Sequence, residues 1–433
     1  MILFLLLLLG FAYYVMKPEE RSRLHRAVLA GAWQVKAEAS RSRPYPFRDA
    51  LHERTRRAFV TPTLVALNLT IFVFMLAGAG ALDDPATLVS WGGNFAPRTT
   101  NGEWWRLVTA MFVHSGMFHL LINIAGLVQV GLILERLLGR VAFAAVYVTA
   151  GVFASLVSLS THPVSVTCGA SGAIFGIYGL LIAVSIWGIF RPSTVTLPLK
   201  AFKRLGPAAA VFILYNVATD SLPAGAELVG FVAGFLCGLG LAINVGDRTT
   251  PARWVAAAMV PAVAIAVALA IPLRGIADVR PEIERVVAVE SRTAGAYQTA
   301  LDRFKSGRMT AEALAQLIDR TIMPELQAAD IRLKALEKVP PEHRPLVADA
   351  EEFVRLRSES WRLRSEGLRK TGGVLRREIG RKDRPSNETV RSRAEAQHRA
   401  SMLTLGKAEG TERASLEALQ RIKPASPSGT GQR

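Results

Sequence analysis

The feature that most constrains this chain is a series of apolar stretches that contain almost no charged residues. Half of its 433 residues are hydrophobic, and most of the stretches approach the roughly 20 residues that cross a bilayer as a helix. Because backbone polar groups in lipid must bond within their own element, such stretches are expected to be helices. The sequence therefore predicts an all-α, polytopic membrane bundle. The apolar stretches fall in residues 1–16, 59–81, 112–134, 141–160, 170–190, 206–222, 228–245 and 254–272.

The positive charge of the chain is distributed in a way that indicates its topology. The formal net charge is +17, which in a soluble protein would suggest a nucleic acid partner. Here Lys and Arg gather between alternate apolar stretches, in residues 17–58, 135–140, 191–205 and 246–253, whereas residues 161–168 and 219–227 contain none. Cytoplasmic loops carry such an excess of basic residues. We therefore expect a partner in the bilayer and no nucleic acid.

The apolar stretches divide the chain into parts. Residues 1–16 lack a basic leader and a small-residue cleavage site, so they are expected to be an uncleaved anchor whose N-terminus lies outside. A basic cytoplasmic linker, 17–58, leads to a six-helix core, 59–245, and a further membrane helix, 254–272, returns the chain outside. Residues 273–380 have helical periodicity and are expected to form a soluble region. The polar, basic end, 381–433, is expected to be disordered.

The two cysteines, Cys168 and Cys237, are too few for a disulfide framework and have no metal-ligand spacing. Both lie at or in expected membrane helices, and packing of a small residue between helices accounts for Cys168.

A serine between small residues stands at the head of one apolar stretch, in Gly169-Ala170-Ser171-Gly172. Ser171 could act as a nucleophile for acyl transfer. Glycines on either side would allow a tight turn and the close approach of a substrate. If Ser171 opens a helix, unbonded backbone N–H groups would point toward a reacting carbonyl and form an oxyanion site.

Polar residues also stand at the head of the stretch before it. His119 and Asn123 are spaced i, i+4, so they would share one face of a helix that starts near Met111. Both could donate hydrogen bonds to an oxyanion, since polar groups at membrane depth usually face the bundle interior. His114 would lie about one turn outward and hold the loop. The alternative is that His119 and Asn123 only join helices together.

With these residues in view, the chain resembles the rhomboid family of intramembrane serine proteases over residues 59–245. The resemblance implies a serine–histidine dyad, no cofactor, and cleavage of single-span membrane proteins near the outer face. Ser171 would be the nucleophile, and His119 and Asn123 would help to form the oxyanion site with Gly169. The residues that carry the resemblance are Glu103-Trp104-Trp105-Arg106, His114, His119, Asn123, Glu135, Gly169 to Gly172, Phe175, Gly234 and Gly238.

The chain departs from the family at the base. In the family, the sixth core helix carries a histidine followed by glycine three residues later and by another glycine four residues after that. Gly234 and Gly238 fit this spacing with Phe231 at the base position, and residues 163–342 contain no histidine at all. Substitutes for the base could be Glu227, one turn before Phe231, or one of the histidines His162, His343 and His398.

Two functions follow from this departure. The first is a rhomboid-type serine endopeptidase that acts on transmembrane segments with a weak or missing base, because the loss of general-base help alone slows a reaction by about 10²–10⁴. The second is a pseudoprotease that binds and regulates or escorts transmembrane proteins without cutting them. A third is an anchor whose role lies in residues 273–433. The Arg/Ala-rich usage and the lack of organellar targeting signals suggest a bacterial plasma membrane.

Overall fold

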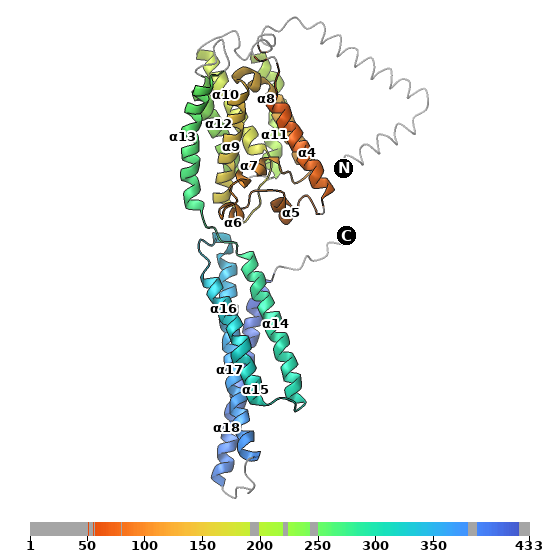
Figure 1. Cartoon of the computed structure of the whole chain (residues 1–433), viewed down its shortest axis with the longest axis vertical. Coiled ribbons are helices and arrows are strands. Elements are labelled where there is room, and N and C mark those ends of the chain that lie inside the picture. Colours follow the sequence, from red (N-terminus) through yellow and green to blue (C-terminus); the bar gives the residue numbers. More distant parts are fainter. Residues whose placement is uncertain are drawn as a thin grey trace, which may run out of the picture.

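The structure is a computed structural model, and it consists of a membrane bundle with a long helical stalk below it (Figure 1). It describes residues 51, 55, 57–78, 80–190, 199–219, 224–242, 250–379 and 388–423. The expected anchor, 1–16, and nearly all of the basic linker, 17–58, lie outside the described residues.

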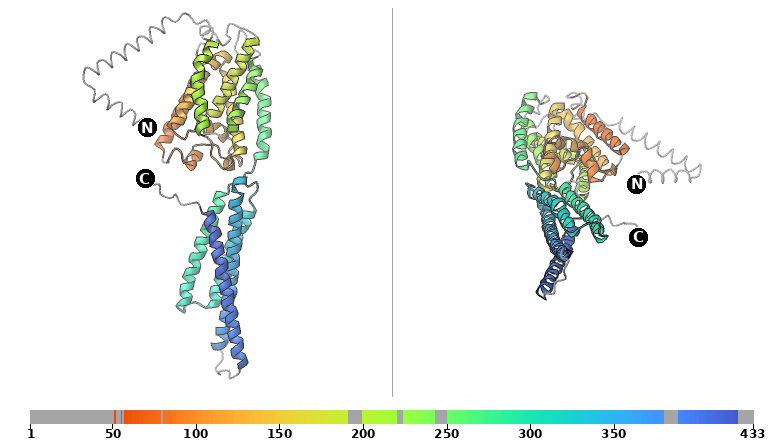
Figure 2. Two further views of the ribbon diagram at one scale, coloured as in Figure 1. Left: turned by 180° about the vertical axis from the view of Figure 1, so that it is seen from behind. Right: turned by 60° about the horizontal axis from the view of Figure 1, so that its bottom comes forward.

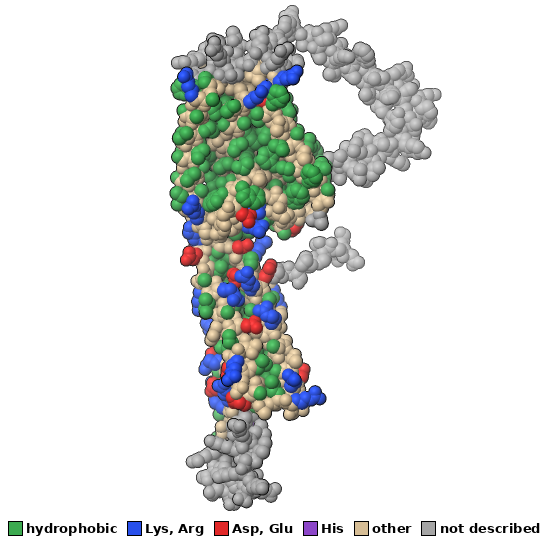
Figure 3. Space-filling model, in the orientation of Figure 1, with side chains coloured by type: hydrophobic (Ala, Val, Ile, Leu, Met, Phe, Trp, Pro, Cys, Tyr) green, Lys and Arg blue, Asp and Glu red, His purple; other side chains and the backbone are tan. Residues whose placement is uncertain are grey.

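The bundle is built from seven long helices of the described chain, one for each apolar stretch from residue 59 onward. Within the described residues, five helices are long and apolar enough to cross a membrane, and the described parts of α11 and α12 are shorter apolar helices. Figure 3 shows their hydrophobic side chains as a broad belt, with charged side chains at its two ends. The fold class is therefore all-α and multi-pass. The helices are α4 (Val60–Ala77), α8 (Met117–Leu138), α9 (Arg140–Thr161), α10 (Ser171–Phe190), α11 (Leu199–Thr219), α12 (Ala224–Ala242) and α13 (Ala252–Ala270).

Helix α10 is the centre of the bundle. It packs most extensively against α12 and also contacts α8 and α9. Its side chains from Ala173 to Leu181, with Ala170 just before it, form much of the hydrophobic core together with residues of α8 and α9. A helix that is apolar all round is expected to occupy such a buried position. Ser171, at the start of α10, is therefore surrounded by other parts of the bundle.

The segment before α8 differs from the prediction. We expected one helix from near Met111, but α8 begins at Met117, after a non-helical stretch at Val113–Gly116 that starts extended and then bends. Short helices precede it, and they fold the long outer loop into a compact cover. They are α5 (Pro85–Ser90), α6 (Ala96–Thr99), α7 (Arg106–Thr109) and the 3₁₀ turn η1 (Ala110–Phe112).

Glu135, near the inner end of α8, fixes the start of α4. Its carboxylate is fully buried and accepts hydrogen bonds from the backbone N–H groups of Phe59, Val60 and Thr61 at 2.5, 2.7 and 2.8 Å. The first N–H groups of a helix have no partner within the helix, and the N-terminus of a helix favours a negative charge. Glu135 therefore joins the first core helix to the second.

The stalk consists of the helices after α13, in residues 280–422, and it has a hydrophobic core of its own. Helix α17 packs along α18 over much of its length. The expected helical region is present. Its elements are α14 (Arg280–Lys305), α15 (Ala311–Leu317), the π-turn η3 (Ile318–Ile322), α16 (Met323–Lys334), the 3₁₀ turn η4 (Pro341–His343), α17 (Arg344–Ile379) and α18 (Glu388–Ile422).

The expectation of disorder from residue 381 onward is wrong for α18. Its buried residues Ser401, Ala408, Ser415 and Ile422 recur every seven residues, which is the repeat of helices that pack along one another. Three of these four residues are small or polar, so the seam is not visible as a hydrophobic pattern. Packing against α17 supplies the stability that the polar composition of α18 does not indicate.

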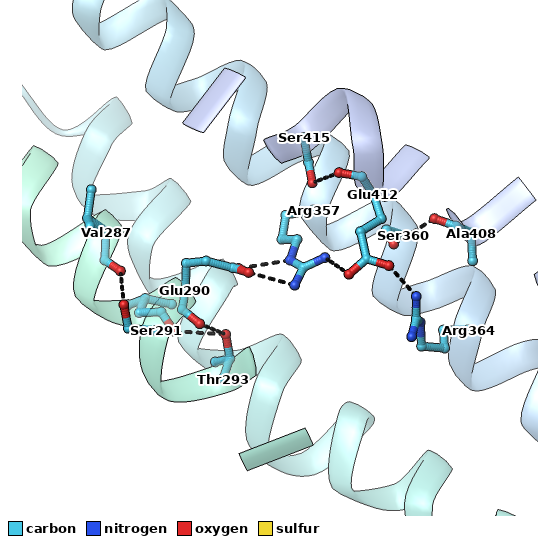
Figure 4. A network of polar contacts seen from close by, with 11 residues as sticks. Val287, Glu290, Ser291, Thr293, Arg357, Ser360, Arg364, Ala408, Glu412 and Ser415 are labelled. Atoms are coloured by element: carbon cyan, nitrogen blue, oxygen red, sulfur yellow. Dashed lines mark hydrogen bonds and ion pairs between the residues drawn. The ribbon is translucent and has the colours of Figure 1, made fainter. Parts of the chain in front are cut away.

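A network of charged groups joins three stalk helices (Figure 4). Arg357 of α17 is buried and donates to both carboxylate oxygens of Glu290 in α14, at 2.8 and 2.6 Å. Its remaining nitrogen donates to Glu412 of α18 at 2.7 Å, and Glu412 also pairs with Arg364. Each buried charge thus has an opposite charge beside it, as burial of charge requires.

The stalk is attached to the end of the bundle at which α10 and α12 begin (Figure 2). The side chain of Asn101 donates to the carbonyl of Ile276 at 2.9 Å, and the N–H of Ile276 donates to the Thr100 hydroxyl at 3.3 Å. The opposite end carries Arg136 of α8 and Arg140 of α9, so the positive-inside pattern predicts that the stalk lies outside the cell or compartment.

Candidate active site

Ser171 is the first residue of α10 and is fully buried, at 0 % exposure. The Ala170 carbonyl accepts from the N–H of Ile174 at 2.9 Å, so the hydrogen-bonded turns start there. Ala170 has no side-chain acceptor with which to cap the helix. The N–H groups of Ser171, Gly172 and Ala173 are therefore the unbonded donors of this helix end. An oxyanion formed at Ser171 would meet them.

The imidazole of His119 lies against the loop just before Ser171. A Cβ on Gly169 would come 2.5 Å from Nε2 of His119, so the ring approaches the backbone more closely than any other residue at 169 would allow. Gly169 also has φ +109°, which favours glycine. At its other nitrogen, Nδ1, His119 meets the Ser115 hydroxyl at 3.1 Å. If that hydroxyl donates to Nδ1, Nε2 carries a proton that it can donate.

Asn123 and His114 flank His119. The Asn123 amide donates to the His119 carbonyl at 2.7 Å, and its Oδ1 is buried without a partner among the described residues. His114, also buried, stacks edge to face on His119 with ring centroids 5.0 Å apart. Its Nδ1 lies 3.3 Å from the Phe112 carbonyl. Thus the structure brings His119, Asn123 and Gly169 together beside the start of α10, with His114 as their support.

Asn94 holds the loop that precedes Ser171. The sequence alone did not predict this structural role. Asn94 and Thr167 exchange two backbone hydrogen bonds at 2.8 and 2.9 Å. The Asn94 side chain is buried, donates to the Ser155 carbonyl and accepts from Thr99. Gly169 is held in the same way, since its N–H donates to the Ala110 carbonyl at 2.9 Å. The outer loop and the serine loop therefore form one unit.

Arg106 is the centre of the outer loop. It is buried and donates to the carbonyls of Val89 and Gly93 at 2.5 and 3.0 Å and to Glu103 at 2.5 Å. Its guanidinium lies over the ring of Trp105, 4.6 Å from the centroid, and the Trp105 side chain is exposed. These residues shape the loop and lie outside the cluster around Ser171.

Helices α10 and α12 run in parallel and touch backbone to backbone. A Cβ on Gly230 would overlap the carbonyl oxygen of Gly172, and a Cβ on Gly234 would overlap that of Gly176. Close approach of helices in membranes depends on such small residues. Further along, Gly238 faces Leu180 and Ala183. Gly230, Gly234 and Gly238 thus form the surface through which α12 contacts α10.

Residues 101–245 match the rhomboid domain family. The chain belongs to the rhomboid family. It is similar to the "Rhomboid protease GluP" of Bacillus subtilis, with 31% identity over 42% of this chain and 35% of the relative. The "Putative rhomboid protease YdcA" of the same organism is 34% identical over 31% of this chain and 66% of its own length. "Rhomboid-like protease 2" of Toxoplasma gondii is 26% identical over 47% and 71%.

This chain thus spans about a third to two thirds of the first relatives that it matches. The rhomboid domain of the match ends at residue 245, so α13 and the stalk lie beyond it. Within the described residues, no three His, Cys, Asp or Glu side chains cluster as a metal ion would require.

The rhomboid domain has Phe231 and Glu227 on the same helix, one turn apart, but at different depths. The carbonyl oxygen of Phe231 lies where a Cβ on Gly179 would be, two turns into α10 from Ser171. The ring of Phe231 is half-buried against the bundle core. Glu227 lies in the first turn of α12, at 5 % exposure, and its Oε1 has no partner among the described residues.

The three histidines considered as substitutes lie in separate places. His162 ends α9 and is exposed. His343 is in η4, at the top of the stalk. His398 is exposed on α18, a helix that Figure 1 shows in the stalk, away from α10. None of the three belongs to the cluster formed by His119, Asn123 and Gly169.

Proposed function

We propose that this rhomboid-family protein is an intramembrane serine endopeptidase that cleaves transmembrane segments of other proteins, with Ser171 as nucleophile. The observation that carries the proposal is the position of Ser171 at the uncapped start of α10, with the His119 ring against Gly169. Similarity to a rhomboid protease and to a putative rhomboid protease of Bacillus subtilis supports the same function.

In this proposal the backbone does much of the catalysis. When Ser171 Oγ bonds to the scissile carbonyl carbon, negative charge develops on the carbonyl oxygen. The N–H groups at the start of α10 are fixed in advance and can donate to that oxygen. Nε2 of His119 and the Asn123 amide would add donors. Removal of one such donor typically slows acyl transfer by about 10²–10³.

The compartment is part of the proposal. We infer a multi-pass protein of a bacterial plasma membrane, with the active serine near the outer face. The composition supports this origin, whereas the relatives come from Bacillus subtilis, Arabidopsis thaliana and Toxoplasma gondii and so do not distinguish one membrane from another.

A non-cleaving rhomboid protein is the second candidate, favoured by the lack of any histidine on α12. Such a protein would use the same bundle to bind or escort transmembrane segments. The two candidates differ in one property, namely the reactivity of Ser171.

The deciding experiment is labelling of the detergent-solubilised full chain with a fluorophosphonate, a probe that bonds only to activated serines. We expect the wild type to label and Ser171→Ala not to label. Ser185→Ala is the matched control, because Ser185 lies in the same helix and its hydroxyl donates to the carbonyl of Leu181, one turn earlier, at 2.6 Å. A wild type that fails to label, while still crosslinking to a transmembrane peptide, would support the non-cleaving candidate.

A further inference from the structure

We propose that Glu227 is the general base for Ser171, so that the nucleophile of this chain works with a carboxylate instead of an imidazole. The inference rests on the proposed peptidase function and names the group that completes it. Three observations lead to it: the pairing of α10 with α12, the burial of Glu227, and the two registers that the glycines of α12 allow.

The pairing of the helices sets the level of Glu227. The carbonyl oxygen of Gly172 meets Gly230. Helix carbonyls point toward the C-terminus, so Gly230 lies slightly deeper in the bundle than Gly172. Glu227 is one turn nearer the start of α12, on the stripe that contains Gly230 and Gly234. Because the two helices run in parallel, this turn lies level with Ser171.

Phe231 is at the wrong depth for this task. Its carbonyl meets Gly179, eight residues into α10. That carbonyl points deeper than the residue that carries it. Because Phe231 follows Gly230 directly, its side chain starts about one turn deeper than that of Glu227, beside the interior of α10 rather than beside its first residue. The glycine spacing that suggested Phe231 is also satisfied one turn earlier, by Glu227, Gly230 and Gly234. The helix contact therefore favours the second register over the one inferred from sequence.

Glu227 is also unexplained by packing. A carboxyl group at 5 % exposure in a membrane bundle is costly unless it has a partner or a function. Ser171 Oγ and Glu227 Oε1 are both buried without hydrogen-bond partners among the described residues. Glu135, the other buried carboxylate in the described part of the bundle, has three backbone donors. Two unsatisfied groups at one level of two touching helices are free to bond to one another, as a nucleophile and its base must during the reaction.

The chemical steps balance without any further reactant except water. The Glu227 carboxylate takes the proton of Ser171 as Oγ bonds to the carbonyl carbon and the carbonyl electron pair moves to oxygen. When the C–N bond breaks, Glu227 returns the proton to the leaving nitrogen. A water molecule then attacks the acyl group, Glu227 takes its proton, and Ser171 Oγ recovers that proton as the ester bond breaks.

Other titratable groups around Glu227 are few, so a pH profile can be assigned. His119 lies on α8 and His114 lies just before it. Helix α9 carries Tyr147 and is followed by His162, α10 carries Tyr178, α11 carries Tyr215 and α12 itself carries Cys237. Arg253 of α13 and Lys200, Lys203 and Arg204 of α11 stand at the opposite end of the bundle from Glu227. Asp220, before α12, lies outside the described residues.

The test is the rate of fluorophosphonate labelling against pH for the full chain in detergent. Glu227→Gln keeps the shape of the side chain, and we expect it to label about 10²–10⁴ times more slowly than the wild type and without the wild-type pH dependence. Glu227→His should restore labelling, with a pH midpoint moved toward the usual histidine value of about 6.5. Phe231→His should leave the wild-type rate and profile unchanged.

The outcomes separate this inference from the proposed function. If Ser171→Ala abolishes labelling but Glu227→Gln labels within a factor of about two of wild type, Ser171 is reactive and Glu227 is not its base. If Phe231→His accelerates labelling and Glu227→His does not, the register that places Phe231 at the base position is correct and this inference is wrong. Loss of labelling in Glu227→Gln counts only if its thermal unfolding midpoint matches that of Ser185→Ala. If it does not match, rescue by Glu227→His decides.

Discussion

The carbonyl oxygen of Gly176 occupies the place that a Cβ on Gly234 would need. Helices α10 and α12 touch through their backbones at this point, and the touch fixes both the depth and the rotation of α12 relative to Ser171. A shift of α12 by one residue would turn Glu227 away from α10 by about 100°.

We therefore expect Gly234→Ala to destabilise the bundle by about 1–3 kcal/mol, the usual cost of overpacking a tight core. It should also slow Ser171 labelling, because α12 must move away from α10. Gly240→Ala is the control, since a Cβ there meets nothing within 4 Å. Thermal unfolding in detergent measures both variants. Equal midpoints for the two would mean that the helices do not touch as described.

The carboxylate of Glu135 offers a second test. Glu135→Gln replaces a charged acceptor of three backbone N–H groups with a neutral amide that has a single acceptor oxygen. We expect a loss of about 1–3 kcal/mol, seen as faster amide hydrogen exchange at residues 60–64. Glu284→Gln, at an exposed position in the stalk, should change stability by less than about 0.5 kcal/mol.

In the stalk, substitution of Arg357 should lower the free energy of unfolding far more than substitution of its exposed neighbours. Arg357→Met leaves the buried Glu290 without its bidentate partner, which typically costs about 3–5 kcal/mol. Arg357→Met combined with Glu290→Leu should recover much of the loss. Arg362→Ala removes a pair with Glu359 whose side chains are 59 % and 42 % exposed and should cost at most about 1 kcal/mol. Amide hydrogen exchange in residues 344–368 measures the stability of all three variants. A double variant as unstable as Arg357→Met would contradict the prediction.

His343 makes the top of the stalk sensitive to pH. Burial lowers its pKa, and the nearby Arg280 lowers it further, although Glu342 and Asp278 act in the opposite direction. The unfolded chain therefore binds the proton more readily than the folded chain. Stability from this group is present above the usual histidine pKa of about 6.5 and is lost as pH falls toward the lowered value. His343→Gln should reduce the decline in stalk stability between pH 7.5 and 5.5, whereas His398→Gln, at an exposed position, should not.

The sequence predicts the parts of this fold that depend on hydrophobicity alone. The apolar stretches from residue 59 onward became membrane helices, and Ser171 opens α10 as expected. The start of α8 was missed because the apolar stretch runs on through Val113, where the chain is extended. Hydropathy does not register a break of four residues in an otherwise apolar segment.

The rest depended on contacts between distant residues. Glu135 was recognised as part of the family pattern, but its hydrogen bonds to residues 59–61 appear only when α4 and α8 meet. The register of α12 could not be read, because Gly230, Gly234 and Gly238 fit the family spacing in two ways. The seam of α18 was missed because serine and alanine fill positions that leucine usually marks.

Helix α13 and the stalk cover one side of the bundle. Helix α13 lies across α9 and α12, on the side of the bundle opposite α4 (Figure 1), and leads directly into the stalk. With 36 residues, α17 extends about 54 Å. A membrane protein with a bulky outer domain that approached from this side would meet the stalk before it reached Ser171. Under the proposed function, access to the serine would then depend on the direction from which a protein approaches as well as on its sequence.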